Sequence, residues 1–239
     1  MKECMFEILE NGFLSESVSL LVLGGDTSAV TAPGQFVSVR IPGFFLRRPF
    51  SVLDCDDGLL TLAYKHAGPG TEALHEIRQG QLNVLTGLGK GFDLEAAGER
   101  PLLVGGGMGF APLYYLAKRL PVKPRVLLGF RSAADVVCAE EFKSLGAELT
   151  VVTEDGFYGE EGLVSDFVAD ADATYFYACG PEAMLRAVCA KAPCAGEFSL
   201  EVRMGCGFGA CTGCSIETVN GPKRVCRDGP VFRKGELPW

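Results

Sequence analysis

Four cysteines near the C-terminal end of the chain constrain its fold more than any other feature. Cys206, Cys211 and Cys214 are spaced C-x4-C-x2-C, and Cys226 follows them after a further loop. This is the ligand spacing of a plant-type [2Fe–2S] cluster. Glycines lie between the cysteines, and they permit the tight turns that bring backbone N–H groups close to cluster sulfurs. The stretch therefore predicts an iron–sulfur site with these four thiolates as ligands.

Two other uses of these cysteines stay open. A Cys4 zinc site usually consists of two C-x2-C pairs, and this stretch contains one such pair. A disulfide framework needs an oxidising compartment. The cysteines outside the motif are scattered, without framework spacing. We assign no role to Cys4 or Cys55, and we interpret Cys138, Cys189 and Cys194 as small apolar residues.

Charge and hydropathy disfavour several classes of protein. The formal net charge is −8 and no basic stripe occurs, so a nucleic-acid partner is not expected. The N-terminal residues lack the apolar segment of a signal peptide. The longest uncharged run, residues 101–117, is interrupted by glycines and a proline and is a poor membrane span. We expect a cytoplasmic protein that does not enter the membrane.

The first third of the chain has the alternating pattern of short antiparallel strands. Strands are expected over residues 17–23, 35–41, 59–65 and 81–89. Several strands at this spacing favour an antiparallel β-barrel. The helical pattern in this part covers residues 71–77, where Thr71 is a suitable N-cap. We expect His75 on the surface of that helix, and we place His66 either beside a ligand or on the barrel exterior.

Two stretches of this barrel can bind a phosphorylated ligand. In RRPFS (47–51), an arginine beside the rigid Pro49 can grip a diphosphate with its forked guanidinium, and Ser51 can donate to a ring nitrogen. In GPGT (68–71), backbone N–H groups at a helix start favour an anion. Each stretch alone has a simpler interpretation, either as a protected sheet edge or as an ordinary turn. Together, upstream of a nucleotide-type domain, they favour binding.

The middle third alternates between strands and helices, which predicts a parallel sheet with ligands at the carboxyl ends of its strands. Strands are expected over 102–104, 125–130, 148–153 and 174–180, and helices over 111–120, 139–145, 163–169 and 181–191. The first strand ends in a glycine turn, Gly105-Gly106-Gly107-Met108-Gly109. This turn does not complete the G-x-G-x-x-G fingerprint, so a purely structural glycine turn stays possible.

Two further strand ends bear on the ligand. Arg131 stands where an acidic residue would contact the ribose of NAD, so the chemistry leaves NAD and NADP both open. Cys179-Gly180-Pro181 ends the strand at 174–180, and no histidine is placed to activate a thiol there. We interpret Cys179 as a polarisable residue beside a nicotinamide, with a buried cysteine as the alternative. No catalytic side chain is assigned.

The order of these motifs resembles one superfamily. RPFS, GPGT, GGGMGFAP and CGPEAML occur in the order found in the ferredoxin–NADP reductases. The loop MGCGFGACTGC and the closing VCRDGPVF resemble, more narrowly, the electron-transfer subunits of NAD-dependent type B dihydroorotate dehydrogenases. The resemblance covers essentially the whole chain. It implies an FAD-binding antiparallel β-barrel (1–98), an NAD-binding α/β parallel-sheet domain (99–195) and a small C-terminal [2Fe–2S] module (196–239).

The resemblance also implies roles for individual residues. The residues that match the family's FAD site are Arg48, Pro49, Phe50, Ser51, Ala63, Tyr64, Lys65, Gly70 and Thr71. The four cysteines match its cluster ligands. We expect the glycine turn and Cys179-Gly180-Pro181 to bind NAD, a diffusible electron acceptor. Lys65 departs from the arginine that is more common at this position, and it lacks the guanidinium fork.

Finally, the resemblance implies a pathway and a partner. An FMN-containing catalytic subunit would oxidise dihydroorotate in pyrimidine (UMP) biosynthesis, and electrons would pass through the cluster and FAD to NAD⁺. The expected complex is a heterotetramer with two copies of each subunit. The chain shows no second flavin domain of its own, which agrees with a separate partner. The alternatives are a subunit of an NAD(P)H:ferredoxin or sulfide-type oxidoreductase, and a redox sensor without sustained turnover.

Overall fold

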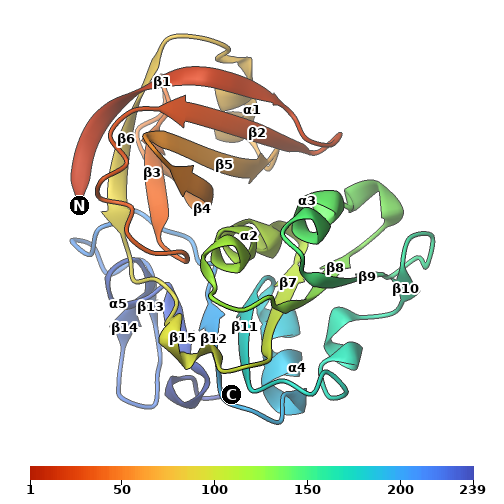
Figure 1. The fold of residues 1–239 in the computed structure, drawn as a ribbon. Coiled ribbons are helices and arrows are strands. Elements are labelled where there is room, and N and C mark those ends of the chain that lie inside the picture. Colours follow the sequence, from red (N-terminus) through yellow and green to blue (C-terminus); the bar gives the residue numbers. More distant parts are fainter.

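The computed structural model describes residues 1–239 as a barrel, an α/β sheet and a small C-terminal region (Figure 1). The barrel is closed, with strand order β1-β2-β5-β4-β3-β6. Its strands are β1 (Lys2–Phe13), β2 (Val18–Gly24), β3 (Phe36–Arg40), β4 (Arg48–Asp56), β5 (Leu59–Lys65) and β6 (Gln81–Leu88). All of its strand pairs are antiparallel. Alternate side chains fill the interior, so the predicted period-two pattern is confirmed.

Helix α1 (Pro69–Glu76) lies between β5 and β6 in the chain. It begins two residues before the predicted start, because Pro69 is suited to a first helical turn. Thr71 is therefore inside the helix and is not its N-cap. The Thr71 hydroxyl accepts a hydrogen bond from the Ala67 N–H at 2.9 Å and donates one to the Gly68 carbonyl at 3.0 Å. The threonine still organises the start of the helix.

The second part is a seven-stranded sheet in the order β10-β9-β8-β7-β11-β12-β15. Its strands are β7 (Pro101–Gly106), β8 (Arg125–Phe130), β9 (Glu148–Thr153), β10 (Glu160–Glu161), β11 (Tyr175–Cys179), β12 (Gly196–Ser199) and β15 (Val231–Arg233). Every neighbouring pair is parallel except β12 with β15. Its helices are α2 (Phe110–Arg119), α3 (Ala139–Ser144) and α4 (Glu182–Lys191). The predicted α/β alternation is confirmed.

One predicted helix is wrong. Residues 163–169 contain only a short 3-10 segment, η4 (Val164–Phe167). The Asp166 carboxylate accepts a hydrogen bond from the Leu163 N–H at 3.3 Å, a local bond that competes with helix propagation. The two β-branched residues of this stretch, Val164 and Val168, are both buried. Sequence periodicity does not separate such a packed turn from a short helix.

The C-terminal region packs against both larger parts (Figure 1). Its regular elements are β13 (Ser215–Ile216), β14 (Lys223–Arg224), α5 (Val225–Asp228) and η5 (Lys234–Glu236). The Gly229 carbonyl accepts a hydrogen bond from the Lys90 N–H at 2.6 Å, and the Pro230 carbonyl accepts one from the Leu200 N–H at 2.9 Å. Strands β12 and β15 extend the sheet from residues beyond 195, and the three-domain division stays a prediction.

Three more 3-10 segments connect these elements: η1 (Glu95–Ala97), η2 (Gly107–Gly109) and η3 (Ala133–Asp135). None of the helices is both long enough and apolar enough to cross a membrane.

Candidate cofactor sites and the cysteine loop

A pocket of about 340 Å³ lies between the barrel and the sheet, and we call it the barrel pocket. It is lined by eight of the nine residues predicted for FAD: Arg48, Pro49, Phe50, Ser51, Ala63, Tyr64, Lys65 and Thr71. The ninth, Gly70, packs directly beneath one of them. A Cβ atom on Gly70 would lie 2.8 Å from Arg48 Nε and 3.1 Å from its Nη2. The two predicted anion-binding stretches therefore meet at one point.

Arg48 is held in place from several sides. Its Cζ lies 5.2 Å from the centre of the Phe44 ring, and its Nη1 donates a hydrogen bond to the Leu46 carbonyl at 2.5 Å. The guanidinium also rests against Gly70, at the start of α1. A fixed cation and a helix N-terminus at one point form a site that suits a diphosphate. The residues therefore fit the phosphate portion of FAD.

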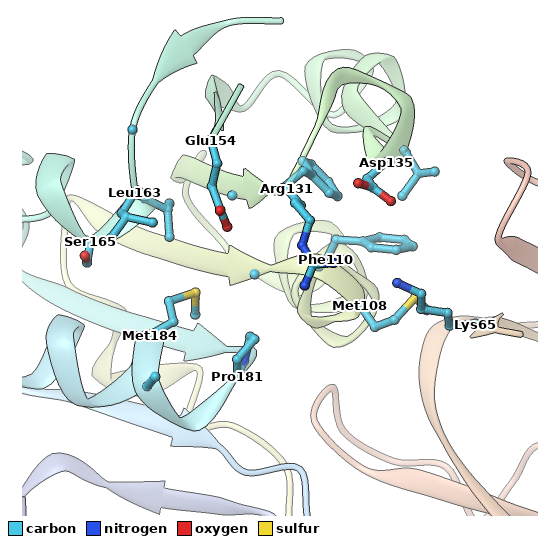
Figure 2. A pocket seen from close by; sticks show the side chains of 18 of the residues that line it. Lys65, Met108, Phe110, Arg131, Asp135, Glu154, Leu163, Ser165, Pro181 and Met184 are labelled. Carbon is cyan, nitrogen blue, oxygen red and sulfur yellow. The ribbon is translucent and has the colours of Figure 1, made fainter. Parts of the chain in front are cut away.

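A second pocket of about 450 Å³ opens at the carboxyl ends of the sheet strands, and we call it the sheet pocket (Figure 2). Of the residues predicted for NAD, it is lined by Gly106, Gly107, Met108 and Pro181. Lys65 and Met108 line both pockets. The two pockets therefore adjoin, as the binding sites of two molecules that exchange a hydride must.

Three glycines of the turn, Gly105, Gly106 and Gly109, also permit close packing. A Cβ on Gly109 would lie 1.9 Å from the Cys179 carbonyl oxygen, and one on Gly106 would lie 2.4 Å from Met184 Sδ. A Cβ on Gly105 would lie 2.8 Å from Leu128 Cδ2. The glycine turn and Cys179-Gly180-Pro181 are thus in direct contact, although Gly105, Gly109, Cys179 and Gly180 do not line the sheet pocket.

Charged residues of both signs line the sheet pocket. Figure 2 shows Arg131 together with Asp135 and Glu154, and Lys65 lies on the barrel side. Glu154 follows β9, and Asp135 ends η3. Two carboxylates beside a single arginine suit a ribose with free hydroxyl groups better than a 2′-phosphate. The sequence alone left this choice between NAD and NADP open.

Cys179 is completely buried at the end of β11. Burial raises the pKa of its thiol well above the ordinary value, and the charge of Glu201 adds to this effect. Its Sγ lies 4.0 Å from Glu201 Oε1. A thiol in this environment stays protonated and is a poor nucleophile, which agrees with the absence of an assigned catalytic nucleophile. Its place beside a nicotinamide stays a prediction.

Glu201 was not among the residues predicted for either pocket. Its side chain is open to the barrel pocket, yet partial burial raises the pKa of its carboxyl above the ordinary value. Glu201 comes two residues after β12, and Ser199 of that strand is paired with Cys179. An acidic residue at the end of a sheet strand was the available signal, but it requires knowing that β12 joins this sheet.

The four predicted cluster ligands form two adjacent pairs. Sγ of Cys214 and Sγ of Cys226 are 3.2 Å apart. The Cys206 N–H donates to Cys211 Sγ at 3.4 Å, and the Cys211 N–H donates to Cys206 Sγ at 3.3 Å. Two pairs agree with two irons that take two thiolates each.

The backbone around Cys206 favours a thiolate. Burial acts to raise the pKa of this thiol, but N–H donors of Cys211, Phe208 and Ala210 lower it to about 6. Burial and the neighbouring thiols Cys214 and Cys206 raise the pKa of Cys226 to about 12. Donors that stabilise one sulfur as an anion are the contacts that a cluster ligand needs.

The segment that carries the four cysteines, residues 204–226, is called the cysteine loop, and it starts at the barrel pocket. Met204 lines that pocket, and Cys206 follows two residues later. A Cβ on Gly207 would lie 3.7 Å from Ser38 Oγ of β3, so the loop is also next to the barrel. Gly207 and Gly209 have φ values of 78° and 89°, a conformation that favours glycine. Cys211 is exposed and Phe208 is 46% exposed, so one edge of the loop faces outward.

A closed antiparallel barrel, a parallel sheet, adjoining pockets between them and a four-cysteine loop define an oxidoreductase of the ferredoxin–NADP reductase fold with an added iron–sulfur module. A family model described as the iron–sulfur cluster binding domain of dihydroorotate dehydrogenase B matches residues 201–238. A second one, the oxidoreductase NAD-binding domain, matches residues 103–190. The chain belongs to the family of electron transfer subunits of dihydroorotate dehydrogenase B (NAD(+)).

Relatives with this name match nearly the whole chain. The subunit from Shouchella clausii (strain KSM-K16) is 41% identical over 93% of this chain and 92% of its own length. The subunit from Bacillus caldolyticus is 45% identical over 86% of each chain. A solved NADH-dependent reduced ferredoxin-NADP oxidoreductase superposes with a TM-score of 0.89, at 28% identity, over 99% of this chain and 90% of that one. These comparisons confirm the predicted superfamily, fold and cofactor set of FAD, [2Fe–2S] cluster and NAD.

Proposed function

We propose that this chain receives electrons from dihydroorotate oxidation in an FMN-containing catalytic partner subunit and delivers them to NAD⁺. The family supports this function, since its members are electron transfer subunits named for that enzyme. The observation that carries it is the linear order of three sites. The barrel pocket shares Lys65 and Met108 with the sheet pocket, and Met204 connects it to the cysteine loop.

This order matches the chemistry of the three cofactors. When bound, a [2Fe–2S] cluster carries single electrons, FAD exchanges either single electrons or a hydride, and NAD⁺ accepts a hydride. The chain's own residues supply binding and orientation. Arg48 and the start of α1 hold the diphosphate, and Ser51 and Tyr64 line the pocket above it. The sheet pocket places its ligand against Met108, at the boundary between the pockets.

The residue assignments belong to the same proposal. FAD is bound by residues 48–51, 63–65, 70 and 71. NAD is bound by Gly106, Gly107, Met108 and Pro181, and the other predicted residues, Gly105, Gly109, Cys179 and Gly180, pack behind the pocket and shape it. Cys206, Cys211, Cys214 and Cys226 are the cluster ligands, supported by their two-pair geometry. The assembly is a cytoplasmic complex with two copies of each subunit, and the outward edge of the cysteine loop faces the catalytic partner.

The native complex tests this function. It is purified anaerobically by a tag on this chain, and its iron, acid-labile sulfide, FAD and FMN are quantified. We expect both flavins, two irons per copy of this chain, and NAD⁺ reduction that requires dihydroorotate and the FMN-containing partner. A complex without FMN that instead responds to reduced ferredoxin would establish the ferredoxin-type alternative. The isolated chain should also sustain NADH oxidation with an artificial acceptor, which a redox sensor would not.

A further inference from the structure

A polar cluster lies at the end of the barrel beneath α1, where Ser19 and His75 are buried, His66 is half-buried and Arg78 is exposed. At its centre, Ser19 Oγ lies 2.8 Å from His66 Nε2 and 2.8 Å from His75 Nδ1. Arg78 Nη2 lies 2.7 Å from His75 Nε2. Both histidines of the chain thus converge on one serine that is completely buried. His75, expected on the helix surface, is only 4% exposed, so that prediction is wrong.

Arg78 determines which nitrogen of His75 carries the proton. A guanidinium can only donate hydrogen bonds, so His75 Nε2 must accept from Arg78. The proton of a neutral His75 is then on Nδ1, where it is donated to Ser19 Oγ. Ser19 Oγ is hydrogen-bonded to His66 Nε2 as well, and either group can be the donor of that bond. The bonds therefore run from Arg78 through His75 and Ser19 to His66, and they require His75 to be neutral.

The same cluster fastens α1 to the barrel strands. Asn11 Nδ2 of β1 donates to the Leu74 carbonyl at 2.8 Å and to the Ile77 carbonyl at 2.9 Å, at the end of α1. Asn11 Oδ1 accepts from the Tyr64 hydroxyl of β5 at 2.7 Å. The last turn of α1 is thereby bonded to β1 and, through His75, to β2. The first turn of the same helix packs against Arg48 in the barrel pocket.

His66 holds the N-terminal end of the segment from residue 66 to residue 75, which borders the barrel pocket. It follows Lys65 and precedes Ala67, and both of these residues line the barrel pocket. Its ring is parallel to that of Tyr64, with centroids 5.9 Å apart. Phe13 covers the cluster, and its ring centroid lies 4.1 Å from that of His75 and 5.5 Å from that of His66. The segment from His66 to His75 is therefore held at both ends by one network.

The charges around His75 oppose its protonation. Burial lowers the pKa of its imidazole, the Arg78 guanidinium and His66 lower it further, and Glu76 of α1 acts in the opposite direction. The strands packed against it present only uncharged groups, namely Asn11 and Phe13 of β1, Ser19 of β2 and Tyr64 of β5. A proton on Nε2 would also break the bond from Arg78 and place two cations in contact.

We propose that Ser19, His66 and His75 are positioning residues for the flavin diphosphate site, and that neutral His75 is the form that docks α1 against Arg48. This proposal rests on the proposed FAD site in the barrel pocket. The folded-state pKa of His75 lies below its ordinary value of 6.5. The stability of the docked helix is therefore fully present above about pH 6.5. It decreases as the pH falls below that value, because His75 binds a proton more readily when α1 is undocked.

FAD affinity of the full chain measures this docking. The chain is stripped of flavin and titrated with FAD between pH 8 and pH 5.5, with flavin fluorescence as the signal. We expect constant affinity above about pH 7 and a progressive loss below pH 6.5. Ser19→Ala should weaken FAD binding about tenfold at every pH, because it leaves Nδ1 of the buried His75 without its partner. His75→Asn keeps a donor toward Ser19 and cannot titrate, so its affinity should depend far less on pH.

Two measurements keep the outcome decisive. Gln79→Ala, an exposed position beyond the network, is the control and should behave as wild type; far-UV circular dichroism at pH 8 verifies that each variant folds. Nitrogen-15 NMR of the imidazole rings reports tautomers directly, and only two histidines must be assigned. We expect His75 as the neutral Nδ1–H tautomer at pH 8.

Each negative result has a distinct meaning. An Nε2–H tautomer, or titration of His75 at its ordinary pKa, would overturn the positioning network. FAD affinity that ignores both pH and Ser19→Ala would also overturn it, while leaving the flavin site intact. A wild-type chain that binds no FAD at any pH would instead reject the proposed function.

Discussion

The barrel pocket and the cysteine loop are built in opposite ways. The barrel pocket joins residues from β4, β5, α1, the glycine turn and the segment after β12, which only the folded core brings together. The cysteine loop uses four residues within one short stretch, and backbone N–H groups of that stretch contact its sulfurs. The pocket is therefore part of the tertiary packing, while the loop depends on its own metal ligands. The two sites should respond separately to mutation.

The sharpest test of this separation is Cys211→Ser. Replacing one thiolate removes a ligand from its pair, so we expect complete loss of the visible absorbance of the cluster. FAD should stay bound with nearly unchanged affinity, because Cys211 does not line the barrel pocket. Iron content and flavin content of the same preparation measure both. Cys194→Ser, outside the loop, should retain both cofactors, and joint loss of iron and FAD in Cys211→Ser would show that the sites are one unit.

The same difference between a local loop and a pocket built by tertiary packing explains which residues could be predicted from the sequence. The cysteine ligands could be predicted from spacing, because the loop is local. Arg48 and Gly70 were each recognised as anion-binding residues, but nothing in the sequence required that one pack on the other. Glu201 was not identified, and His75 was wrongly expected on the helix surface, because the surroundings of both residues come from strands distant in sequence. Periodicity predicted strands at β2, β3, β5, β6, β7, β8, β9 and β11 but not at β1, β10, β12 or β15, and it could not separate the 3-10 turn at η4 from a helix.

Gly109→Ala should destabilise the packing around the two pockets without affecting the cysteine loop. The added Cβ would lie 1.9 Å from the Cys179 carbonyl oxygen, a rigid backbone atom. We expect the free energy of unfolding to fall by about 3 kcal/mol, measured by urea denaturation of the flavin-free protein. Gly235→Ala is the matched control, since a Cβ there meets nothing within 4 Å. Equal stability of the two variants would show that the contact is not tight.

Arg48→Ala should affect only the diphosphate-binding part of the barrel pocket. Loss of a charge-assisted hydrogen-bond donor to the diphosphate should weaken FAD binding by about 2 kcal/mol, or roughly thirtyfold. Arg48→Lys should recover part of this affinity, because lysine keeps the charge but not the fork. Flavin fluorescence titration gives the affinities, and the iron content should be unchanged in both variants. An exposed cation of β3, Arg40, provides the control as Arg40→Ala.

The smallest expected effect concerns the nucleotide at the far end of the pathway. Glu154 and Asp135 line the sheet pocket beside Arg131, where their charges oppose a 2′-phosphate. Glu154→Gln should therefore raise the NADPH:NADH ratio of kcat/KM by a few-fold, since one exposed charge is worth up to about 1 kcal/mol. The double variant with Asp135→Asn should raise the ratio further, while FAD content and cluster absorbance stay constant. If the ratio instead stays fixed while FAD is lost, the two pockets are coupled through Lys65 and Met108. In that case only the cysteine loop, and not the sheet pocket, would respond to mutation independently of the barrel pocket.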